Sequence, residues 1–551
     1  MKIGAAAVLP LFAFSMSLLA QAVPPAVKKA AASIDAEKIR AHVRFLADDL
    51  LEGRYPGLRG GDLAAKYIAT QFALDGLKPA GDNGTYLQWI NFVGMKVIPE
   101  QTSFALVPQK GKAIDLKFAD DYTVQNQTLT PDVNLDAPIV FVGYGVTAPE
   151  FGWNDYAGVD VKGKVILCIV GDPPSNDPKF FGGKALTYYG RWTYKFEQAA
   201  RMGAVGALII HRTDLASYGW DVVRNSNSSE KTYLRDDKTP PLKAASWIQL
   251  EVARKLFAAS GMNLDTEMTA AGERGFKAVE LPVRLKAHVE STVRRFQSAN
   301  VVGIVPGTKP GKDQAVLYTA HYDHLGFVPG MKGDNIYNGA ADNGTGCGIL
   351  LELARAWSTM TVRPPHDVIF AAVTAEEQGL LGSEYLGQHP PVPAGQIALD
   401  LNYDMILPVG IPREINVNGA QRTSFYPTVQ ATAKRFGLTI VPDPRPEAGT
   451  YYRSDHFSLS RVGIPAFSID PGTLYEGHDR AWGEATEQDY NEHRYHNFSD
   501  NYSPEMDFRG NAKLARFGME LGWEAVSAPA MIRWNAGDEF EAAGKASLEA
   551  K

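Results

Sequence analysis

Cysteine and long apolar runs are scarce in this sequence, and positive charge is not in excess. Only Cys168 and Cys347 are present among 551 residues, far apart and both inside apolar stretches. This placement argues against a disulfide scaffold and a thiolate metal site, and it predicts two buried thiols. Lys and Arg number 55 against 62 Asp and Glu, a net charge of -7. Without a basic excess, the chain is not expected to bind nucleic acid.

The single long apolar run lies at the N-terminus. Lys2 precedes an apolar stretch over residues 3–19, which is followed by Ala20-Gln21-Ala22. A positive start, an apolar middle and an A-x-A ending are typical of a secretory signal peptide rather than a membrane anchor. We therefore predict cleavage after Ala22 and an exported protein, periplasmic or secreted. No membrane span is expected in the mature chain.

The remaining chain is too long for one ordinary domain, and its pattern of apolar and turn residues changes along its length. Residues 34–86 predict a helix, a loop and a second helix, while residues 131–285 begin with short apolar strands separated by turn residues. From residue 299 onward, apolar strands alternate with helices, which indicates a mostly parallel sheet covered on both faces. In such sheets, reactive residues gather at the carboxyl ends of the strands.

Two helices can be predicted from their apolar spacing. The first has Asp35 as its N-cap, and the second begins near residue 345. Their expected apolar stripes are Ile39, Val43, Leu46 and Leu50 in the first, and Leu350, Leu353, Ala354 and Trp357 in the second.

Possible metal ligands follow two of the predicted strands directly. The strand AVLYTA runs into His321, and Asp323 two residues later could accept the other ring N–H of that histidine. The strand DVIFAAVTA runs into Glu376 and Glu377. Two adjacent carboxylates at a sheet edge repel each other unless a cation offsets them, so a metal is the favoured explanation.

Three further segments carry similar side chains. The strand IALDLNYDM ends in Asp404, the segment RYHNFSDNY contains Tyr495 and His496, and Asp342 lies in a small-residue loop before a helix. Taken alone, Asp342 would be interpreted as a helix cap. Taken together, two histidines and three carboxylates form a ligand set that zinc accepts, and the lack of cysteine favours a catalytic site.

Six motifs carry a resemblance to a known family. HYDHLG, GAADNGTG, TAEEQGLLGS, NYDM, SDHFSLSRVGIPAF and YHNFSD, in this order, resemble the co-catalytic di-zinc exopeptidases, which include secreted aminopeptidases and glutamate carboxypeptidases. The resemblance covers nearly the whole mature chain. It implies an α/β fold, with a three-layer αβα domain built on a mostly parallel mixed sheet. It also implies a small β-rich insertion similar to the protease-associated domain.

On this basis the expected organisation has five segments. They are a signal peptide (1–22), the N-terminal part of the catalytic domain (34–130), the inserted domain (131–285), the main catalytic domain (286–528) and a C-terminal tail (529–551). The inserted domain is interpreted either as a substrate-access element or as a spacer.

The resemblance also implies a role for each matched residue. Asp342 would bridge two zinc ions, with Glu377 and His496 completing one site and His321 and Asp404 the other. Glu376 would be the general base, Asp323 would orient His321, and Tyr495 could donate a hydrogen bond to the developing oxyanion. The family often has an aspartate just before the bridging residue, whereas this chain has Ala341.

The expected function is hydrolysis of N-terminal residues from peptides by a zinc aminopeptidase. The alternatives are a carboxypeptidase of the glutamate carboxypeptidase type and a non-catalytic binding protein with the same fold. A single-zinc glutaminyl cyclase is disfavoured by the complete ligand set. His456, Arg453 and Tyr451 are the candidates for substrate binding. An arginine there could hold a substrate carboxylate, but one arginine does not make a basic cluster.

Overall fold

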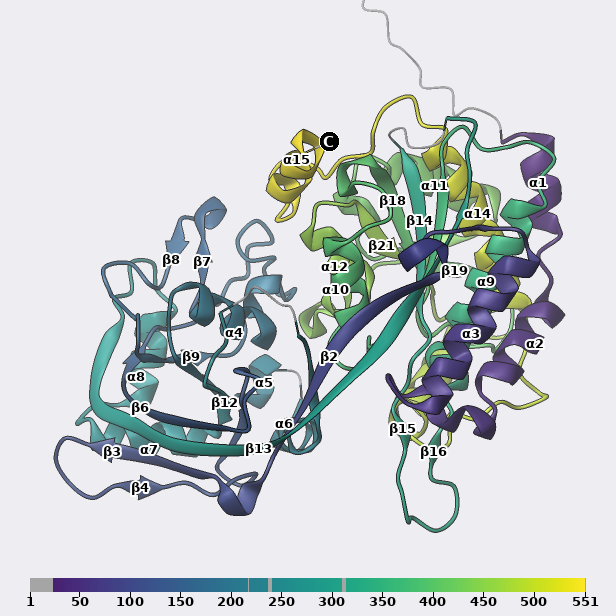
Figure 1. The fold of residues 1–551 in the computed structure, drawn as a ribbon. Helices are drawn as coiled ribbons and strands as arrows, with labels where there is room; N and C mark the ends of the chain where they lie inside the picture. The colour runs from purple at the N-terminus through teal and green to yellow at the C-terminus, as the bar shows by residue number, and fades with distance from the viewer. Residues whose placement is uncertain (1–22, 217, 236–239, 310–313, 551) are drawn as a thin grey trace, which may run out of the picture.

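The chain forms two lobes that are joined by long strands (Figure 1). The computed structural model describes residues 23–216, 218–235, 240–309 and 314–550. The expected signal peptide, residues 1–22, lies outside the described residues. Within those residues, none of the helices is both long and apolar enough to cross a bilayer.

The sheet of the first lobe is mostly parallel, as predicted. Four neighbouring strands run parallel, and β13 lies antiparallel beside β17. Every residue of β14, β17 and β18 is buried, which explains why these strands appear in the sequence as continuous apolar runs. The strands, in order across the sheet, are β21 (Ala466–Ser468), β18 (Ile397–Asn402), β14 (Ala315–His321), β17 (Val368–Val373) and β13 (Val279–Val305).

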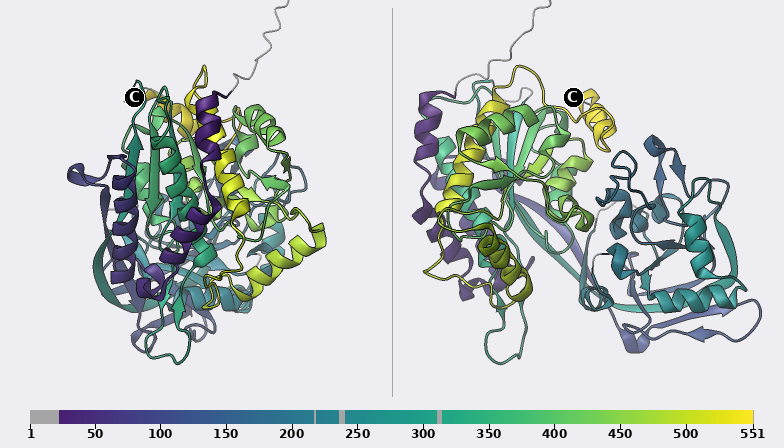
Figure 2. Two further views of the ribbon diagram at one scale, coloured as in Figure 1. Left: turned by 90° about the vertical axis from the view of Figure 1, so that its right-hand side faces the viewer. Right: turned by 180° about the vertical axis from the view of Figure 1, so that it is seen from behind.

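Helices cover both faces of this sheet, so the predicted three-layer arrangement is confirmed (Figures 1 and 2). One face carries α9 (Gly346–Ser358) and α14 (Arg509–Val526), with α1 (Pro25–Ala32), α2 (Ala36–Leu46) and α3 (Arg59–Leu74) packed around them. The other face carries α10 (Leu381–Gln388) and α12 (His456–Arg461).

The two predicted helices form, with one difference in length. Asp35 caps α2 by accepting a hydrogen bond from the Glu37 N–H, and the predicted stripe of α9 is buried. The expected continuation of α2 to Leu50 is wrong. The helix ends at Leu46, and Asp48 caps a new 3-10 turn by accepting from the Leu50 N–H, which leaves the Leu50 side chain 73% exposed.

The second lobe has its own sheet and its own apolar cores. Its strands β6 (Asp132–Phe141), β9 (Val165–Ile169), β10 (Gly206–Ile210) and β12 (Ala244–Ile248) are parallel, and β5 (Tyr122–Gln125) is antiparallel to β12. Its helices are α4 (Trp192–Arg201), α5 (Thr213–Ala216), α6 (Trp220–Ser228), α7 (Leu250–Ala259) and α8 (Leu264–Ala271).

The core of this lobe extends beyond the expected limits of 131 and 285. It includes Phe104, from β3 (Ser103–Pro108), and Val289 near the middle of β13. The reason is that β13 runs without interruption through both sheets and pairs with β3 and β6 in this one. Before entering the first lobe it pairs with β2 (Leu87–Val97), and these two strands form the ribbon between the lobes (Figure 1).

Shorter elements complete the chain. The strands are β1 (Lys78–Pro79), β4 (Ile114–Asp115), β7 (Thr147–Ala148), β8 (Trp153–Asn154), β11 (Lys231–Leu234), β15 (Gly326–Phe327), β16 (Ile336–Tyr337), β19 (Glu414–Asn416), β20 (Thr439–Ile440) and β22 (Asp470–Pro471). The helices are α11 (Tyr426–Arg435), α13 (Arg480–His493) and α15 (Glu541–Glu549).

A buried arginine ties three segments of the first lobe together. The Arg54 side chain is 1% exposed, and its guanidinium donates to the backbone carbonyls of Leu46, Tyr322, Asn338 and Gly339 at 2.5–2.9 Å. A planar guanidinium offers five donors in fixed directions, which an ammonium group cannot match. Arg54 therefore holds together the end of α2, the residue after β14 and the segment before α9.

We expect Arg54→Met to lower the free energy of unfolding by about 3 kcal/mol, because it leaves buried carbonyls without donors. Chemical denaturation of the full chain measures this loss. Arg44→Met on the exposed face of α2 is the matched control and should change stability by less than about 0.5 kcal/mol. Equal stability of the two variants would contradict the tethering role of Arg54.

Candidate metal centre

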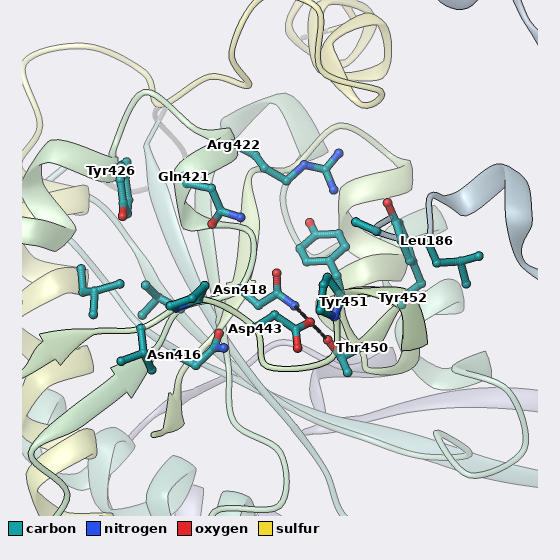
Figure 3. Close-up of a pocket in the computed structure, with 17 residues that line it drawn as sticks. Leu186, Asn416, Asn418, Gln421, Arg422, Tyr426, Asp443, Thr450, Tyr451 and Tyr452 are labelled. Carbon is teal, nitrogen blue, oxygen red and sulfur yellow. Dashed lines mark hydrogen bonds between the residues drawn. The ribbon is translucent and has the colours of Figure 1, made fainter. Parts of the chain in front are cut away.

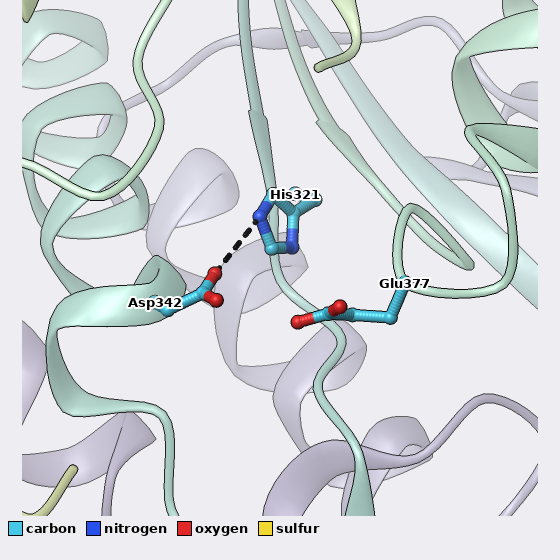
Figure 4. Close-up of side chains that lie close together, drawn as sticks. All are labelled: His321, Asp342 and Glu377. Carbon is cyan, nitrogen blue, oxygen red and sulfur yellow. Dashed lines mark ion pairs between the residues drawn. The ribbon is translucent and has the colours of Figure 1, made fainter. Parts of the chain in front are cut away.

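Three side chains from separate segments meet at the carboxyl end of the sheet. His321 is the last residue of β14, Glu377 follows β17, and Asp342 lies in the turn before α9. One ligand atom from each lies within 4.8 Å of the others (Figure 4). The parallel direction of β14 and β17 explains this meeting, because it brings both strand ends to one edge.

Asp404 and His496 join the same cluster. The Asp404 Oδ1 lies 3.1 Å from the His321 Nε2, and the His496 Nε2 lies 3.0 Å from the Glu377 Oε2. Asp342 lies between the two histidines. Its Oδ1 is 3.4 Å from the His321 Nε2, and its Oδ2 is 3.2 Å from the His496 Nε2. All five side chains that the sequence analysis selected as ligands are therefore in one place.

The cluster has a strongly negative field. Burial opposes the charged form of His321, yet the carboxylates of Asp404 and Glu376 raise its pKa well above the ordinary value. Burial also opposes ionisation of Asp342, but hydrogen bonds from His321 and His496 hold its pKa well below the usual range. Burial raises the pKa of Glu376 well above its usual value, and the nearby carboxylates of Glu377 and Asp404 add to the effect.

This donor set fits zinc. Imidazole nitrogens and carboxylate oxygens are both ligands that zinc accepts. Several buried carboxylates in one place carry a desolvation cost that a bound cation would offset. The histidine tautomer also fits. The His321 Nδ1 donates to the backbone carbonyl of Asp323 at 3.2 Å, so the Nε2 is the ring nitrogen that faces the cluster and could bind a metal.

Asp323 differs from expectation in its contact. Its carboxylate lies 3.9 Å from the His321 Nδ1, and its backbone carbonyl takes the ring N–H instead. The carboxylate accepts from the backbone N–H groups of Glu376 at 3.1 Å and Glu377 at 3.4 Å. Because β14 and β17 end side by side, the Asp323 side chain reaches the turn after β17. It therefore fixes both glutamates rather than the histidine.

Three supporting residues were not assigned from the sequence. Asp500 accepts from the Ala341 and Asp342 N–H groups at 3.1 Å. His324 lies with its Nδ1 2.6 Å from the Glu377 Oε1, and the Ser454 hydroxyl donates to the Asp404 Oδ2 at 2.7 Å. All three lie inside the matched motifs. Their place in these motifs was the signal that the sequence offered. Their contact partners could be identified only from the folded structure.

The other selected residues lie around the cluster. Tyr495 is 45% exposed, and its ring stacks on His496 with centroids 3.9 Å apart. His456 is 1% exposed at the start of α12, and burial lowers its pKa to about 3. Arg453 is exposed in the segment before Ser454. Tyr451 is 5% exposed, and its hydroxyl donates to the Ala466 carbonyl.

A cavity of about 520 Å³ lies where the second lobe meets this segment (Figure 3). Tyr451 and Tyr452 line it together with Leu186 of the second lobe. The Leu186 N–H donates to the Pro446 carbonyl at 3.0 Å, so the two lobes are in direct contact here. The segment that lines the cavity continues into Ser454, the partner of Asp404.

Comparison with known proteins identifies similar sequences. An aminopeptidase, YwaD, from Bacillus subtilis is 35% identical over 212 residues, covering 37% of this chain and 41% of that protein. Leupeptin-inactivating enzyme 1 from Streptomyces exfoliatus is 28% identical over 247 residues, covering 42% of this chain and 51% of that protein. The matched regions span about half or less of these curated relatives.

Among solved structures, an aminopeptidase from Aneurinibacillus sp. strain AM-1 aligns with a TM-score of 0.49 and 19% identity, over 92% of this chain and 97% of that one. Residues 300–516 match the family model described as Peptidase family M28. This segment contains His321, Asp342, Glu377, Asp404 and His496. The match to peptidase family M28 thus includes all five candidate metal ligands.

Proposed function

We propose that this protein is a zinc-dependent aminopeptidase that uses two zinc ions to release N-terminal residues from peptides. The observation that carries the proposal is the position of Asp342, whose two carboxylate oxygens face two different histidines at 3.4 and 3.2 Å. A carboxylate placed in this way suits a bridging ligand. The names of relatives, including an aminopeptidase and a probable zinc metalloprotease, agree with the choice of metal and reaction.

The remaining ligands would divide into two groups. His321 and Asp404 would hold one ion, and His496 and Glu377 the other. When bound, zinc supplies Lewis-acid activation of the scissile carbonyl and of the attacking water. Asp323, Asp500 and Ser454 would keep these side chains in place through the hydrogen bonds described above.

Glu376 is proposed as the general base. It differs from the other carboxylates because its nearest histidine contact is 4.0 Å, from its Oε2 to the His321 Nε2, whereas Asp342, Glu377 and Asp404 all lie within 3.4 Å of an imidazole nitrogen. Its carboxylate is thus left to take a proton from water and deliver it to the leaving amine. Tyr495, partly exposed beside His496, could donate to the developing oxyanion.

Export, to the periplasm or beyond the cell, is a further part of the proposal. It rests on the sequence of residues 1–22. The second lobe is proposed to border the path of the substrate, because it contacts the segment that carries Ser454.

The number of metal ions can be measured directly. We expect elemental analysis of the purified protein to give two zinc ions per chain. Treatment with a chelator should abolish activity, and added zinc should restore it. Asp342→Ala should lose most of both ions, because it removes the shared ligand. One ion per chain in fully active protein would contradict the two-zinc assignment.

The base assignment has a separate test. We expect Glu376→Gln to keep both zinc ions and to lower kcat by about 10²- to 10⁴-fold, since the amide cannot accept the proton. Glu484→Gln, at an exposed position on α13, is the control and should leave kcat unchanged. Near-normal turnover by Glu376→Gln with full metal content would remove Glu376 from this role.

The direction of cleavage can be decided with blocked dipeptides. We expect hydrolysis of dipeptides that have a free N-terminus and a blocked C-terminus, and no hydrolysis of those with a blocked N-terminus. Product analysis with and without chelator provides the measurement. The opposite preference would favour the carboxypeptidase alternative. Zinc binding with no hydrolysis of either set would favour a non-catalytic binding protein.

A further inference from the structure

Two arginines at the junction of the lobes have no anionic partner. Arg191 precedes α4 in the second lobe, and Arg453 ends the short helical turn before Ser454 in the first. In the part of the chain that the structure describes, neither side chain forms an ion pair or a hydrogen bond. The Arg191 Nε is in addition fully buried.

Aromatic contacts hold the two segments against each other. The ring of Tyr188 lies 4.9 Å from that of Phe457 and 6.3 Å from that of Tyr452, the residue before Arg453. The Arg191 N–H donates to the Tyr188 carbonyl at 3.0 Å, so Arg191 is part of the same contact. Burial lowers the pKa of Arg191 to about 10, and the positive charge of Arg453 adds to this effect.

A buried cation beside a second cation is unfavourable without a counter-charge. Removing a guanidinium from water costs free energy that only an anion or a set of acceptors repays. Elsewhere in this chain a deeply buried arginine has such acceptors, as the four carbonyls around Arg54 illustrate. Arg191 lacks such acceptors although its Nε is buried, and the exposed Arg453 lacks them too. Their planar, forked donors match a carboxylate, which they can bind in a bidentate manner.

We propose that Arg191 and Arg453 together bind the free C-terminal carboxylate of a short peptide whose scissile bond lies at the metal centre. This inference rests on the proposed peptidase function and names its substrate class. Arg453 adjoins Ser454, whose hydroxyl lies 2.7 Å from Asp404. Because Arg453 is next in sequence to this partner of Asp404, the substrate chosen for the test is a short peptide of about three residues, each of which adds about 3.4 Å when extended.

The test compares Leu-Gly-Gly with its C-terminal amide, which differs in the terminal charge. In the wild-type, zinc-loaded protein we expect kcat/KM to be at least tenfold higher for the free acid, mainly through KM. Arg191→Met and Arg453→Met should each bring the ratio of kcat/KM for the free acid to kcat/KM for the amide close to one. Arg191→Lys, which keeps the charge, should retain part of the preference.

Two controls separate recognition from damage to the fold. Leucine p-nitroanilide has no carboxylate, so its hydrolysis by the two methionine variants reports any damage to the fold or to the metal centre separately from the acid-to-amide ratio. Arg284→Met, in the second lobe, removes an exposed arginine that is already paired with Asp136 at 2.7 Å, and it should leave the ratio unchanged. A wild-type ratio near one would overturn the proposal, as would an unchanged ratio in both Arg191→Met and Arg453→Met.

A binding measurement keeps this inference distinct from the proposed activity. Calorimetry with N-acetyl-Gly-Gly and its amide needs no turnover. If the wild type hydrolyses no peptide, the aminopeptidase proposal fails. Tighter binding of the free acid, lost in Arg453→Met, would still support the arginine site. Equal binding of acid and amide would overturn it. If Leu-Gly-Gly is cleaved to Leu-Gly and Gly, the proposed aminopeptidase direction is wrong. A preference for the free acid over the amide would still support the site formed by Arg191 and Arg453.

Discussion

The concentration of buried carboxylates at one end of the first sheet is the constraint on which the site depends. Asp342, Glu376, Glu377 and Asp404 lie within a few ångströms of two histidines. Such a group is costly to bury without cations. The fold meets this constraint by giving most of these groups hydrogen-bond partners and by placing them at the ends of fully buried strands. A bound metal ion would offset the negative charge of these carboxylates, and this makes their burial in one place physically reasonable.

The second lobe is connected to that site at more than one point. The ribbon of β2 and β13 carries it, and β11 pairs with β2. From β11, the Thr232 hydroxyl donates to the side chain of Gln378, the residue after Glu377. On another side, Tyr188 packs against Tyr452 and Phe457. The lobe thus contacts both the turn that carries the glutamates and the segment that supports Asp404, which favours an access element over a spacer.

Local sequence patterns predicted some features well and others poorly. The continuous apolar runs of β14, β17 and β18 could be interpreted correctly because both faces of these strands are covered. The end of α2 was misplaced, since Leu50 fits helical spacing but a cap at Asp48 begins a new turn. The start of the second lobe was placed too late, because pairing of β3 with β13 joins residues far apart in the chain. Spacing alone carries no information on such pairing.

The sequence by itself determined the strand ends, the identity of the five side chains that meet there and the similarity of residues 300–516 to peptidase family M28. These follow from local order, because a ligand type and an apolar run are both properties of short segments. Only the tertiary structure decided which group each side chain contacts. It assigned the Asp323 carboxylate to the turn of Glu376 and gave Asp342 two histidines. It also brought the segment of Arg191 to that of Arg453. Contacts of this kind join residues tens to hundreds of positions apart, so they depend on how the strands and lobes pack.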